Sequence, residues 1–250
     1  RYVYENIKKN VHLTSISGGT DIVSCFVLGN PNMPVYPGEI QCKGLGMDVA
    51  ILDSDGNSIK NKKGELVCLT PFPSKPIYFW KDNNYDKLKK TYFSKYPNIW
   101  QHGDFAKISL NNGIIIYGRS DATLNVGGIR IGTSEIYRVV ENIANVNECI
   151  AAEQKYENNN RVILFVKLNT NKKLDNEFIN LIKNKIKISL SPKHVPSLII
   201  QVSDIPKTKS SKIVEITIKQ ILNNEEITNL NSIINPECLK DYKNINELQN

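Results

Sequence analysis

YGRSDATLNVGGIRIGTSE, residues 117–135, is the most informative part of the chain. It follows a short apolar run typical of a strand and leads into an amphipathic segment typical of a helix. Its glycines and charged residues include Gly118, Arg119, Asp121, Gly127, Gly128 and Arg130. Paired glycines let a backbone approach a ligand closely or absorb a large change in φ and ψ. Arginine is the planar donor suited to phosphate and carboxylate. This part of the chain therefore predicts a mobile joint that handles an anionic substrate.

The whole chain has 250 residues, which suits two domains or one large one. Hydrophobic residues make up 40% of it and the mean hydropathy is -0.32, as in soluble globular proteins with a core. No apolar run approaches the length of a membrane span. The chain begins with neither an initiator Met nor a signal-like segment, so we expect it to be part of a longer polypeptide.

The five cysteines are odd in number and show no CxxC or His-paired spacing. They favour reduced thiols and a cytoplasmic location over a disulfide framework or a zinc site. The net charge of +7 is compatible with nucleic-acid binding. Because the lysines are scattered among asparagines, a solvated surface biased toward anionic substrates is the favoured interpretation, and no nucleic-acid partner is expected. Nothing in the sequence indicates an oligomeric state.

The segment SGGTD, residues 17–21, follows a weakly alternating run at residues 12–16 that predicts a buried strand. Small residues after a strand expose backbone N–H groups to a phosphate. A hydroxyl and a carboxylate, here Thr20 and Asp21, are suited to Mg²⁺. The same four letters GGTD also form ordinary turns, so both interpretations stay open at this point.

Strand-like segments and tight turns fill residues 38–68 and predict a small β-barrel or meander. The aromatic run PFPSKPIYFW, residues 71–80, either lines a pocket or packs against those strands. In WQHGDFAKI, residues 100–108, Asp104 follows a glycine at the end of an aromatic strand, where a buried carboxylate accepts hydrogen bonds from hydroxyl or N–H groups. His102 is interpreted as structural.

Beyond the joint, the pattern predicts helices at residues 134–143, 174–190 and 214–222, with Thr133 or Ser134 capping the first. Strands are predicted at residues 149–152, 162–168 and 198–202. PKTKSSKI, residues 206–213, is a polar loop that carries Lys212 just before the last helix. A lone lysine in such a loop is usually a solvated surface residue. Residues 225–250 are polar and Asn-rich, and Pro236 interrupts any helix.

Residues 118–136 resemble the hinge motif of the adenylate-forming enzymes, which include acyl-CoA synthetases, luciferases and the adenylation domains of peptide synthetases. That family has Thr-Glu where this chain has Thr20 and Asp21, and a (T/H)-G-D motif that matches Asp104. Its P-x-T-x-S-G-K loop matches Lys212, with Ser211 in place of the usual glycine. Within the family, GGTD, residues 71–80 and residues 125–140 look closest to the branch that activates acetoacetate.

The resemblance implies roles for particular residues. It implies nucleotide contacts from Gly18, Gly19, Thr20, Asp104, Arg119 and Lys212, with Thr20 and Lys212 as the catalytic groups. Asp21 would hold Mg²⁺, and Asp121 would be the hinge. CoA would contact Gly127, Gly128 and Arg130. The implied small molecules are ATP, Mg²⁺, CoA and acetoacetate.

The implied fold is α/β (α+β): the C-terminal part of a large adenylating domain with a barrel-like subdomain, followed by a small mobile α+β domain. The predicted divisions are residues 1–119 for the adenylating part, 120–124 for the hinge, 125–230 for the small domain and 231–250 for a polar tail. The implied reaction is the ATP-dependent ligation of acetoacetate to CoA. We expect residues 1–250 alone to be inactive, because the phosphate loop that the family has upstream is missing. Two alternatives stay open: another short-chain acyl-CoA ligase, or a non-catalytic nucleotide-binding or nucleic-acid-binding fragment.

Overall fold

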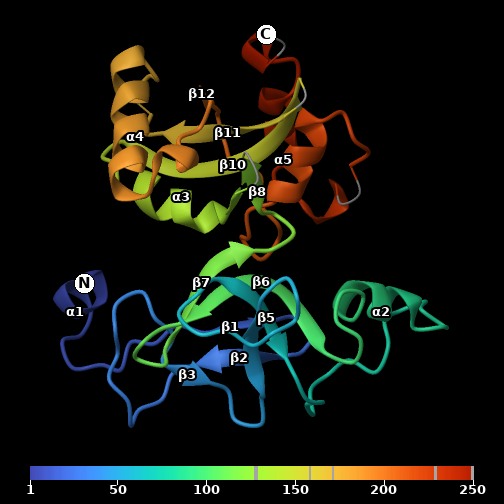
Figure 1. Ribbon diagram of the computed structural model, residues 1–250. Coiled ribbons are helices and arrows are strands. Elements are labelled where there is room, and N and C mark those ends of the chain that lie inside the picture. Colours follow the sequence, from blue (N-terminus) through green and yellow to red (C-terminus); the bar gives the residue numbers. More distant parts are fainter. Residues whose placement is uncertain (127–128, 158, 171, 228–229, 249–250) are drawn as a thin grey trace. The chain divides into compact units, whose positions relative to one another are not determined.

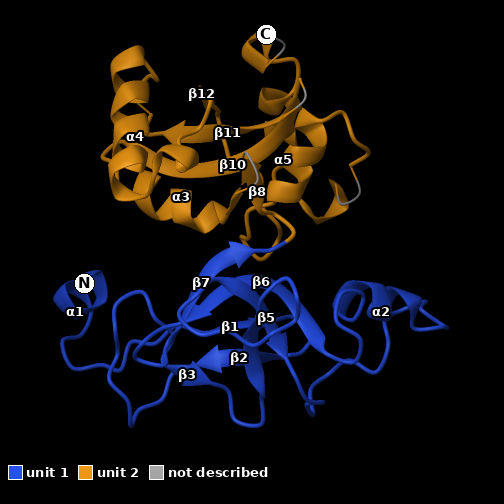
Figure 2. Ribbon diagram, in the orientation of Figure 1, with its two compact units in different colours: residues 1–120 blue, residues 121–250 orange. Residues whose placement is uncertain are grey.

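The structure, a computed structural model, describes residues 1–126, 129–157, 159–170, 172–227 and 230–248. The chain divides into two compact units, Arg1–Ser120 (unit 1) and Asp121–Asn250 (unit 2), which Figure 2 colours separately. Each unit is considered by itself. Gly127 and Gly128, the predicted CoA contacts, lie outside the described residues. The predicted hinge and domain limits stay predictions.

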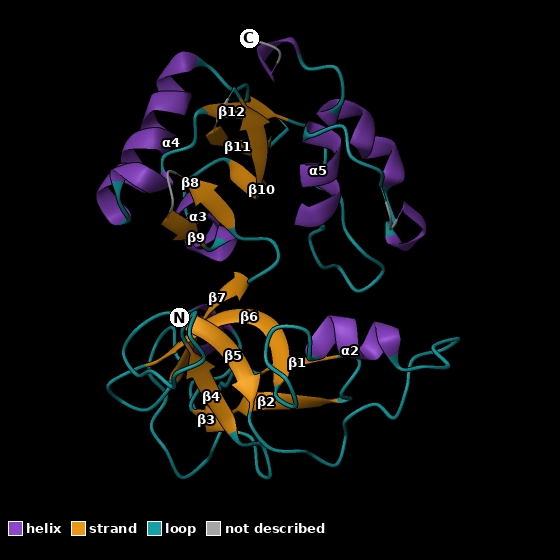
Figure 3. Cartoon of the chain, turned by 45° about the vertical axis from the view of Figure 1, so that its right-hand side comes forward, coloured by secondary structure: helices purple, strands orange, loops and turns teal. Residues whose placement is uncertain are grey.

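Unit 1 is built mainly from short antiparallel strands (Figures 1 and 3). Its elements are α1 (Tyr2–Asn6), β1 (Ser17–Gly19), β2 (Ser24–Leu28), β3 (Cys42–Lys43), β4 (Val49–Leu52), β5 (Gly64–Cys68), α2 (Asp86–Tyr92), β6 (Trp100–Ile108) and β7 (Ile114–Arg119). Strands β1, β2 and β3 form one sheet, and β4 to β7 form a second in sequence order. Consecutive antiparallel strands need only short connections, which agrees with the turns predicted between residues 38 and 68.

An aromatic cluster fills the core of unit 1. Trp100 opens β6, and Phe72 meets it edge-on with ring centroids 5.3 Å apart. Phe26 of β2 lies 5.2 Å from Phe72 in the same edge-to-face geometry, which the charge distribution of aromatic rings favours. Of the run at residues 71–80, Phe72 packs in this cluster, and Tyr78 and Trp80 are exposed. Pro71, Phe72, Lys75 and Ile77 also line a cavity, so both interpretations of this run hold for some of its residues.

The strand predicted at residues 12–16 is wrong. These residues form no strand in the structure and are exposed, and β1 begins only at Ser17. Gly18 and Gly19 supply the pairing instead, opposite Cys25 and Ser24 of β2. The physical reason is that the weak alternation at residues 12–16 carries little apolar surface to bury. The strand therefore forms only at residues 17–19, which have a pairing partner in β2.

Unit 2 combines a three-stranded sheet, formed by β10, β11 and β12, with helices on both faces (Figure 1). Its elements are β8 (Leu124–Val126), β9 (Ile129–Ile131), α3 (Thr133–Val140), β10 (Val146–Tyr156), β11 (Asn159–Leu168), α4 (Asn176–Ser189), η1 (Pro192–His194), β12 (Leu198–Gln201), α5 (Glu215–Leu222), η2 (Leu230–Ser232), η3 (Pro236–Tyr242) and η4 (Asn246–Leu248). Strands β10 and β11 are antiparallel, and β12 joins β11 in parallel. β8 and β9 form a separate hairpin.

Alternate residues of β10 and β11 enter two different cores. Ala151 and its cross-strand partner Leu164 pack with α3 and α4. The neighbouring pair, Ile150 and Phe165, packs with α5 and with the segment that contains η3. A sheet buried on both faces is apolar at successive positions, which explains why β11 reads as a continuous run rather than an alternating one.

The helices of unit 2 lie close to their predicted ranges. Asp175 caps α4, and its carboxylate accepts a hydrogen bond from the N–H of Phe178 at 2.8 Å. The cap predicted for the first helix is wrong: Gly132 is the N-cap of α3, and Glu135 accepts a hydrogen bond from its N–H at 2.9 Å. Glycine is an acceptable N-cap, and the Glu135 side chain satisfies an N–H group that the helix leaves unpaired. None of the helices in the described ranges has the length and apolar character needed to cross a bilayer.

Candidate nucleotide site

The turn that follows β1 carries the predicted phosphate-contacting residues. Gly18 packs so tightly against β2 that a Cβ on it would lie 2.1 Å from the carbonyl oxygen of Ser24, so only glycine fits there. Thr20 and Asp21 come immediately after the strand, and both are exposed. The tight pairing of β1 with β2 therefore ends at a surface turn that offers one hydroxyl and one carboxylate.

Asp21 is held by Tyr92, the last residue of α2, which the sequence analysis did not single out. The Tyr92 hydroxyl donates a hydrogen bond to Oδ2 of Asp21 at 2.5 Å. The Tyr92 ring stacks on Trp100 with centroids 3.6 Å apart, which fixes the hydroxyl. Burial, together with the neighbouring Asp21 carboxylate, raises the pKa of Tyr92 well above its usual value, so this hydroxyl stays protonated. Asp21 is thus oriented while remaining at the surface.

His102, the third residue of β6, lies between β1 and the predicted ribose-binding Asp104. Its Nε2 lies 3.2 Å from the carbonyl oxygen of Gly18. Because a carbonyl only accepts hydrogen bonds, Nε2 carries the proton and donates it. The same nitrogen lies 3.6 Å from Oδ2 of Asp104. A histidine engaged in this way fits the structural role that the sequence analysis assigned to it.

Arg119 ends β7 directly opposite Asp104 in the register of the sheet. Its Nη1 donates to the carbonyl oxygen of His102 at 3.2 Å and lies 3.7 Å from Oδ1 of Asp104. Gly103 makes room for this guanidinium: its φ is +83°, and a Cβ there would lie 2.8 Å from Nη2. The Arg119 side chain is 49% exposed, while that of Asp104 is 12% exposed. The guanidinium donors of Arg119 are therefore accessible to solvent, and the carboxylate of Asp104 is mostly buried beside them.

Unit 1 thus brings together residues that lie far apart in the sequence. Gly18, Asp104 and Arg119 meet around His102. Thr20 and Asp21 follow Gly19 directly along the chain. The group combines a carboxylate acceptor with guanidinium donors and an exposed hydroxyl. These groups are chemically suited to a ligand with both hydroxyl and phosphate groups.

Lys212 lies in unit 2, on a tight hairpin between β12 and α5. The hairpin is closed by a hydrogen bond from the N–H of Thr208 to the carbonyl oxygen of Lys212 at 2.8 Å. The Thr208 hydroxyl accepts the N–H of Lys212 at 3.2 Å. Lys212 itself is exposed. The polar loop predicted at residues 206–213 is therefore an ordered turn that presents a lysine at the surface.

Ser211 occupies a left-handed backbone conformation in this hairpin, with φ of +60°. This is where the related loops carry glycine, and the conformation disfavours a residue with a Cβ. We expect Ser211→Gly to raise the free energy of unfolding by about 0.5–1 kcal/mol, because relief of backbone strain exceeds the entropy that glycine adds to the unfolded chain. Denaturant unfolding measures this, with Ser210→Gly as the matched control, which should be destabilising. A loss of stability in Ser211→Gly would contradict the interpretation.

The remaining predicted residues lie around the start of unit 2. Asp121 is the first residue of that unit and is exposed. Arg130 is exposed on β9, opposite Asn125 of β8. Their predicted roles, hinge for Asp121 and CoA contact for Arg130, stay predictions.

Comparison with known proteins connects the whole chain to one kind of enzyme, although no family model matches it. The chain is 48% identical over 248 residues to the acetoacetyl-coenzyme A synthetase of Rhizobium meliloti, an alignment that covers 99% of this chain and 38% of the relative. It is 45% identical over 251 residues to the acetoacetyl-CoA synthetase of Xenopus tropicalis, covering 100% of this chain and 37% of the relative. The chain therefore spans just over a third of the length of these relatives.

Solved structures give the same result. The acetoacetyl-CoA synthetase from Streptomyces lividans matches with a TM-score of 0.87 and 36% identity, over 94% of this chain and 36% of that one. An anthranilate CoA ligase in complex with anthranoyl-AMP matches with a TM-score of 0.76 over 89% of this chain and 42% of that one. At 19% identity it supports the fold alone. The predicted resemblance is confirmed, and so is a mixed arrangement of sheets and helices that matches part of the adenylating fold. The barrel-like shape and the mobility of the small domain stay predictions.

Proposed function

We propose that the full-length natural protein containing this chain ligates acetoacetate to CoA with ATP, giving acetoacetyl-CoA, AMP and pyrophosphate. The observation that carries this proposal is the cluster of Gly18, His102, Asp104 and Arg119, which lies in a chain 48% identical to an acetoacetyl-CoA synthetase. In the first half-reaction a carboxylate oxygen of acetoacetate attacks the α-phosphorus of ATP, and pyrophosphate leaves. In the second, the CoA thiolate attacks the acyl carbon, and AMP leaves.

The nucleotide would be held mainly by unit 1. Asp104 would accept hydrogen bonds from both ribose hydroxyls, because it is a mostly buried carboxylate whose position is fixed by His102 and Arg119. Arg119 would donate to the ribose and phosphate side of the nucleotide from its exposed position. Thr20 would contact the α-phosphate with its hydroxyl. Gly18 and Gly19 would let the nucleotide approach this turn closely.

The residues present also fit Mg²⁺. Mg²⁺ prefers oxygen ligands and is commonly bound by one or two carboxylates together with substrate phosphates. Asp21 offers such a carboxylate at the surface, and Tyr92 fixes one of its oxygens. Bound there, the ion would neutralise charge on the phosphates during displacement.

Lys212 would supply a second positive charge for the adenylation half-reaction. Phosphoryl chemistry of this kind needs charge neutralisation and positioning more than covalent help. In the second half-reaction unit 2 would turn about Asp121 and remove Lys212 from the site. Arg130 would then contact CoA, with Gly127 and Gly128 leaving room for the pantetheine arm. The cytoplasm is the proposed location, because CoA and ATP are both available there.

The choice of acid gives the direct test of this function. We expect the full-length protein to release AMP with acetoacetate well ahead of butyrate and acetate, in the presence of ATP and CoA. Acetoacetate differs from butyrate by one carbonyl, and a site that hydrogen-bonds this oxygen rejects the analogue that lacks it. The measurement is AMP release over a panel of acids at equal concentration, with omission of CoA as the control.

The outcomes separate the candidate functions. A preference for acetate or a long-chain acid would reassign the protein to another acyl-CoA ligase. If no acid supports AMP release, the chain would instead belong to a non-catalytic nucleotide-binding protein.

A further inference from the structure

The hairpin that carries Lys212 is anchored by a segment later in the chain. Thr208 forms an antiparallel bridge with Ile233, and the N–H of Ile234 donates to the carbonyl oxygen of Lys207 at 2.9 Å. The next residue, Asn235, accepts the N–H of Lys207 through Oδ1 at 3.0 Å. Both backbone groups of Lys207, at the start of the hairpin, are therefore hydrogen-bonded. The carbonyl oxygen accepts from Ile234, and the N–H donates to the Asn235 side chain.

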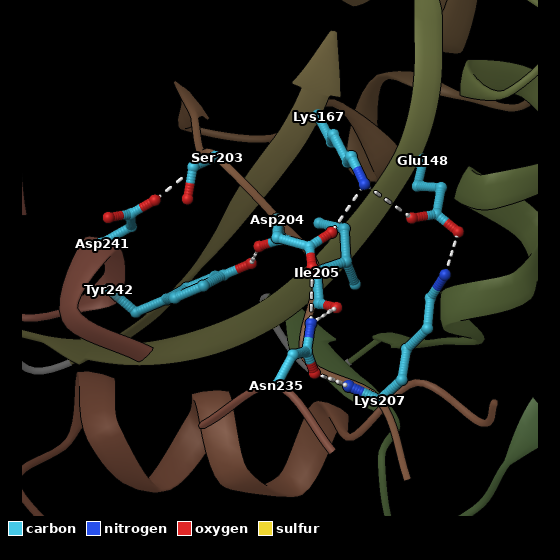
Figure 4. A network of polar contacts seen from close by, with 9 residues as sticks. All are labelled: Glu148, Lys167, Ser203, Asp204, Ile205, Lys207, Asn235, Asp241 and Tyr242. Carbon is cyan, nitrogen blue, oxygen red and sulfur yellow. Dashed lines mark hydrogen bonds and ion pairs between the residues drawn. The ribbon is translucent and has the colours of Figure 1, made fainter. Parts of the chain in front are cut away.

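Asn235 makes three hydrogen bonds at once, which Figure 4 shows converging on its side chain. Its Nδ2 donates to Oδ2 of Asp204 at 2.6 Å and to the carbonyl oxygen of Ile205 at 2.9 Å, while Oδ1 accepts the N–H of Lys207. Two acceptors face the nitrogen and one donor faces the oxygen, so the amide fits in one orientation. Asn235 thereby ties together the three residues that lead into the hairpin.

Charged side chains extend this connection to the sheet. Asp204 accepts a hydrogen bond from Lys167 of β11 at 2.6 Å, and Lys167 lies 3.8 Å from Glu148 of β10. Glu148 in turn forms an ion pair with Lys207. Two carboxylates and two ammonium groups thus alternate around the base of the hairpin (Figure 4). Lys207 and Glu148 are each 25% exposed, so this pairing is only partly screened by water.

The same segment is fixed at its far end. The Tyr242 hydroxyl donates to the carbonyl oxygen of Asp204 at 2.9 Å, and Asp241 accepts the N–H of Ser203 at 2.8 Å. Tyr242 is buried against Phe165, with ring centroids 4.7 Å apart. Residues 203–205, to which Asn235 is bonded, are therefore held by Asp241 and Tyr242. The three hydrogen bonds of Asn235 connect the hairpin to this segment.

We infer that Asn235 is a positioning residue for Lys212: it acts on the adenylation half-reaction by fixing the base of the hairpin. This inference rests on the proposed function. A catalytic group must be held within a fraction of an ångström of its productive position, and small displacements from remote changes cost large factors in rate. Loss of the Asn235 bonds would leave Lys212 present but poorly placed. Thioester formation, which does not use Lys212, would not depend on Asn235.

The test compares the two half-reactions in the full-length natural protein. Acetoacetate-dependent ATP–pyrophosphate exchange reports adenylation, and thioester formation from supplied acetoacetyl-adenylate and CoA reports the second step. We expect Asn235→Ala to lower exchange by about tenfold or more while thioester formation stays within about twofold. Asn231→Ala, an exposed asparagine in η2, is the matched control and should change neither.

A second experiment separates positioning from a general structural role. In a Lys212→Ala background, Asn235→Ala should cause no further loss of exchange, because its effect passes through Lys212. If Asn235→Ala fails to fold, Asn235→Ser takes its place: serine keeps a polar side chain but is too short to reach Asp204, Ile205 and Lys207 together, so it should show the same split between half-reactions.

Equal losses in both half-reactions, or an additional loss in the Lys212→Ala background, would overturn the inference. If the parent protein is active and Asn235→Ala shows unchanged ATP–pyrophosphate exchange, the inference about Asn235 would be overturned while the proposed function would stand. If the parent itself showed no acetoacetate-dependent exchange, the proposed function would fall, and the inference with it.

Discussion

Lys212→Ala in the full-length protein is expected to lower acyl-adenylate formation by about 10²–10³-fold, the usual cost of removing one charged contact to a transition state. Thioester formation from supplied acetoacetyl-adenylate should be nearly unchanged, because Lys212 is proposed to act only in the first half-reaction. ATP–pyrophosphate exchange and CoA-dependent AMP release from the adenylate are the two measurements.

The neighbouring Lys209 provides the control for this experiment. It is exposed on the same hairpin and has the same charge, so Lys209→Ala should leave both half-reactions close to those of the parent. An equal effect of the two substitutions would mean that the hairpin contributes only a general positive field. An undiminished rate of pyrophosphate exchange in Lys212→Ala would remove this lysine from the mechanism.

Asp104→Asn is expected to lower kcat/KM for ATP by about a hundredfold, mainly by raising KM. Asparagine keeps the shape of the side chain but replaces a charged acceptor of two ribose hydroxyls with one neutral oxygen. Hydrogen bonds to charged groups contribute about 1.5–3 kcal/mol each, and a hundredfold corresponds to about 2.8 kcal/mol. Initial rates of pyrophosphate exchange at varied ATP concentration give both constants.

Two comparisons make the Asp104 result specific. Asp55→Asn, at an exposed turn of the same unit, should leave KM for ATP unchanged. A 2′,3′-dideoxy analogue of ATP should be used equally poorly by the parent and by Asp104→Asn, because the hydroxyls that Asp104 would bind are missing. If the variant still discriminated against this analogue as strongly as the parent does, the ribose contact would have to come from another residue.

Much of the fold was predictable because the sequence pattern is strong where elements are buried. The aromatic strand predicted before Asp104 is part of β6, but β6 continues past Asp104 to Ile108, so the expected end of this strand was wrong. The amphipathic segment at residues 174–190 corresponds to α4, whose inward-facing residues Phe178, Ile182 and Ile186 recur at helical spacing. Strands β10 and β11 extend beyond the predicted limits, because their polar ends continue the backbone ladder without contributing apolar side chains.

The site residues that sequence reasoning missed are those that act through another residue. Tyr92 lies in no motif, and its relation to Asp21 depends on how α2 packs on Trp100, which is a tertiary contact. The acid partner of His102 could not be assigned from sequence, although Asp104 is only two residues away along β6. Side chains at i and i+2 share one face of a strand, and this spacing was the available indication.

The final segment was predicted as a polar tail, and its composition is indeed polar. Its few apolar side chains are nevertheless buried: Cys238, Leu239 and Tyr242 complete one core of unit 2. They lie on the 3₁₀ helix η3, which begins at Pro236. Their spacing of three and four residues is helical, but it covers less than two turns in a polar segment. A pattern this short did not predict the contact with β11.

The residues that cover this core come late in the chain, which has a consequence for biosynthesis. The face of β10 and β11 that holds Ile150 and Phe165 leaves the ribosome long before the residues that shield it, Leu239 and Tyr242. During this interval the nascent chain presents a sticky apolar surface, which is the state in which chains aggregate or recruit chaperones. Completion of the C-terminal segment ends the period in which this apolar face is exposed.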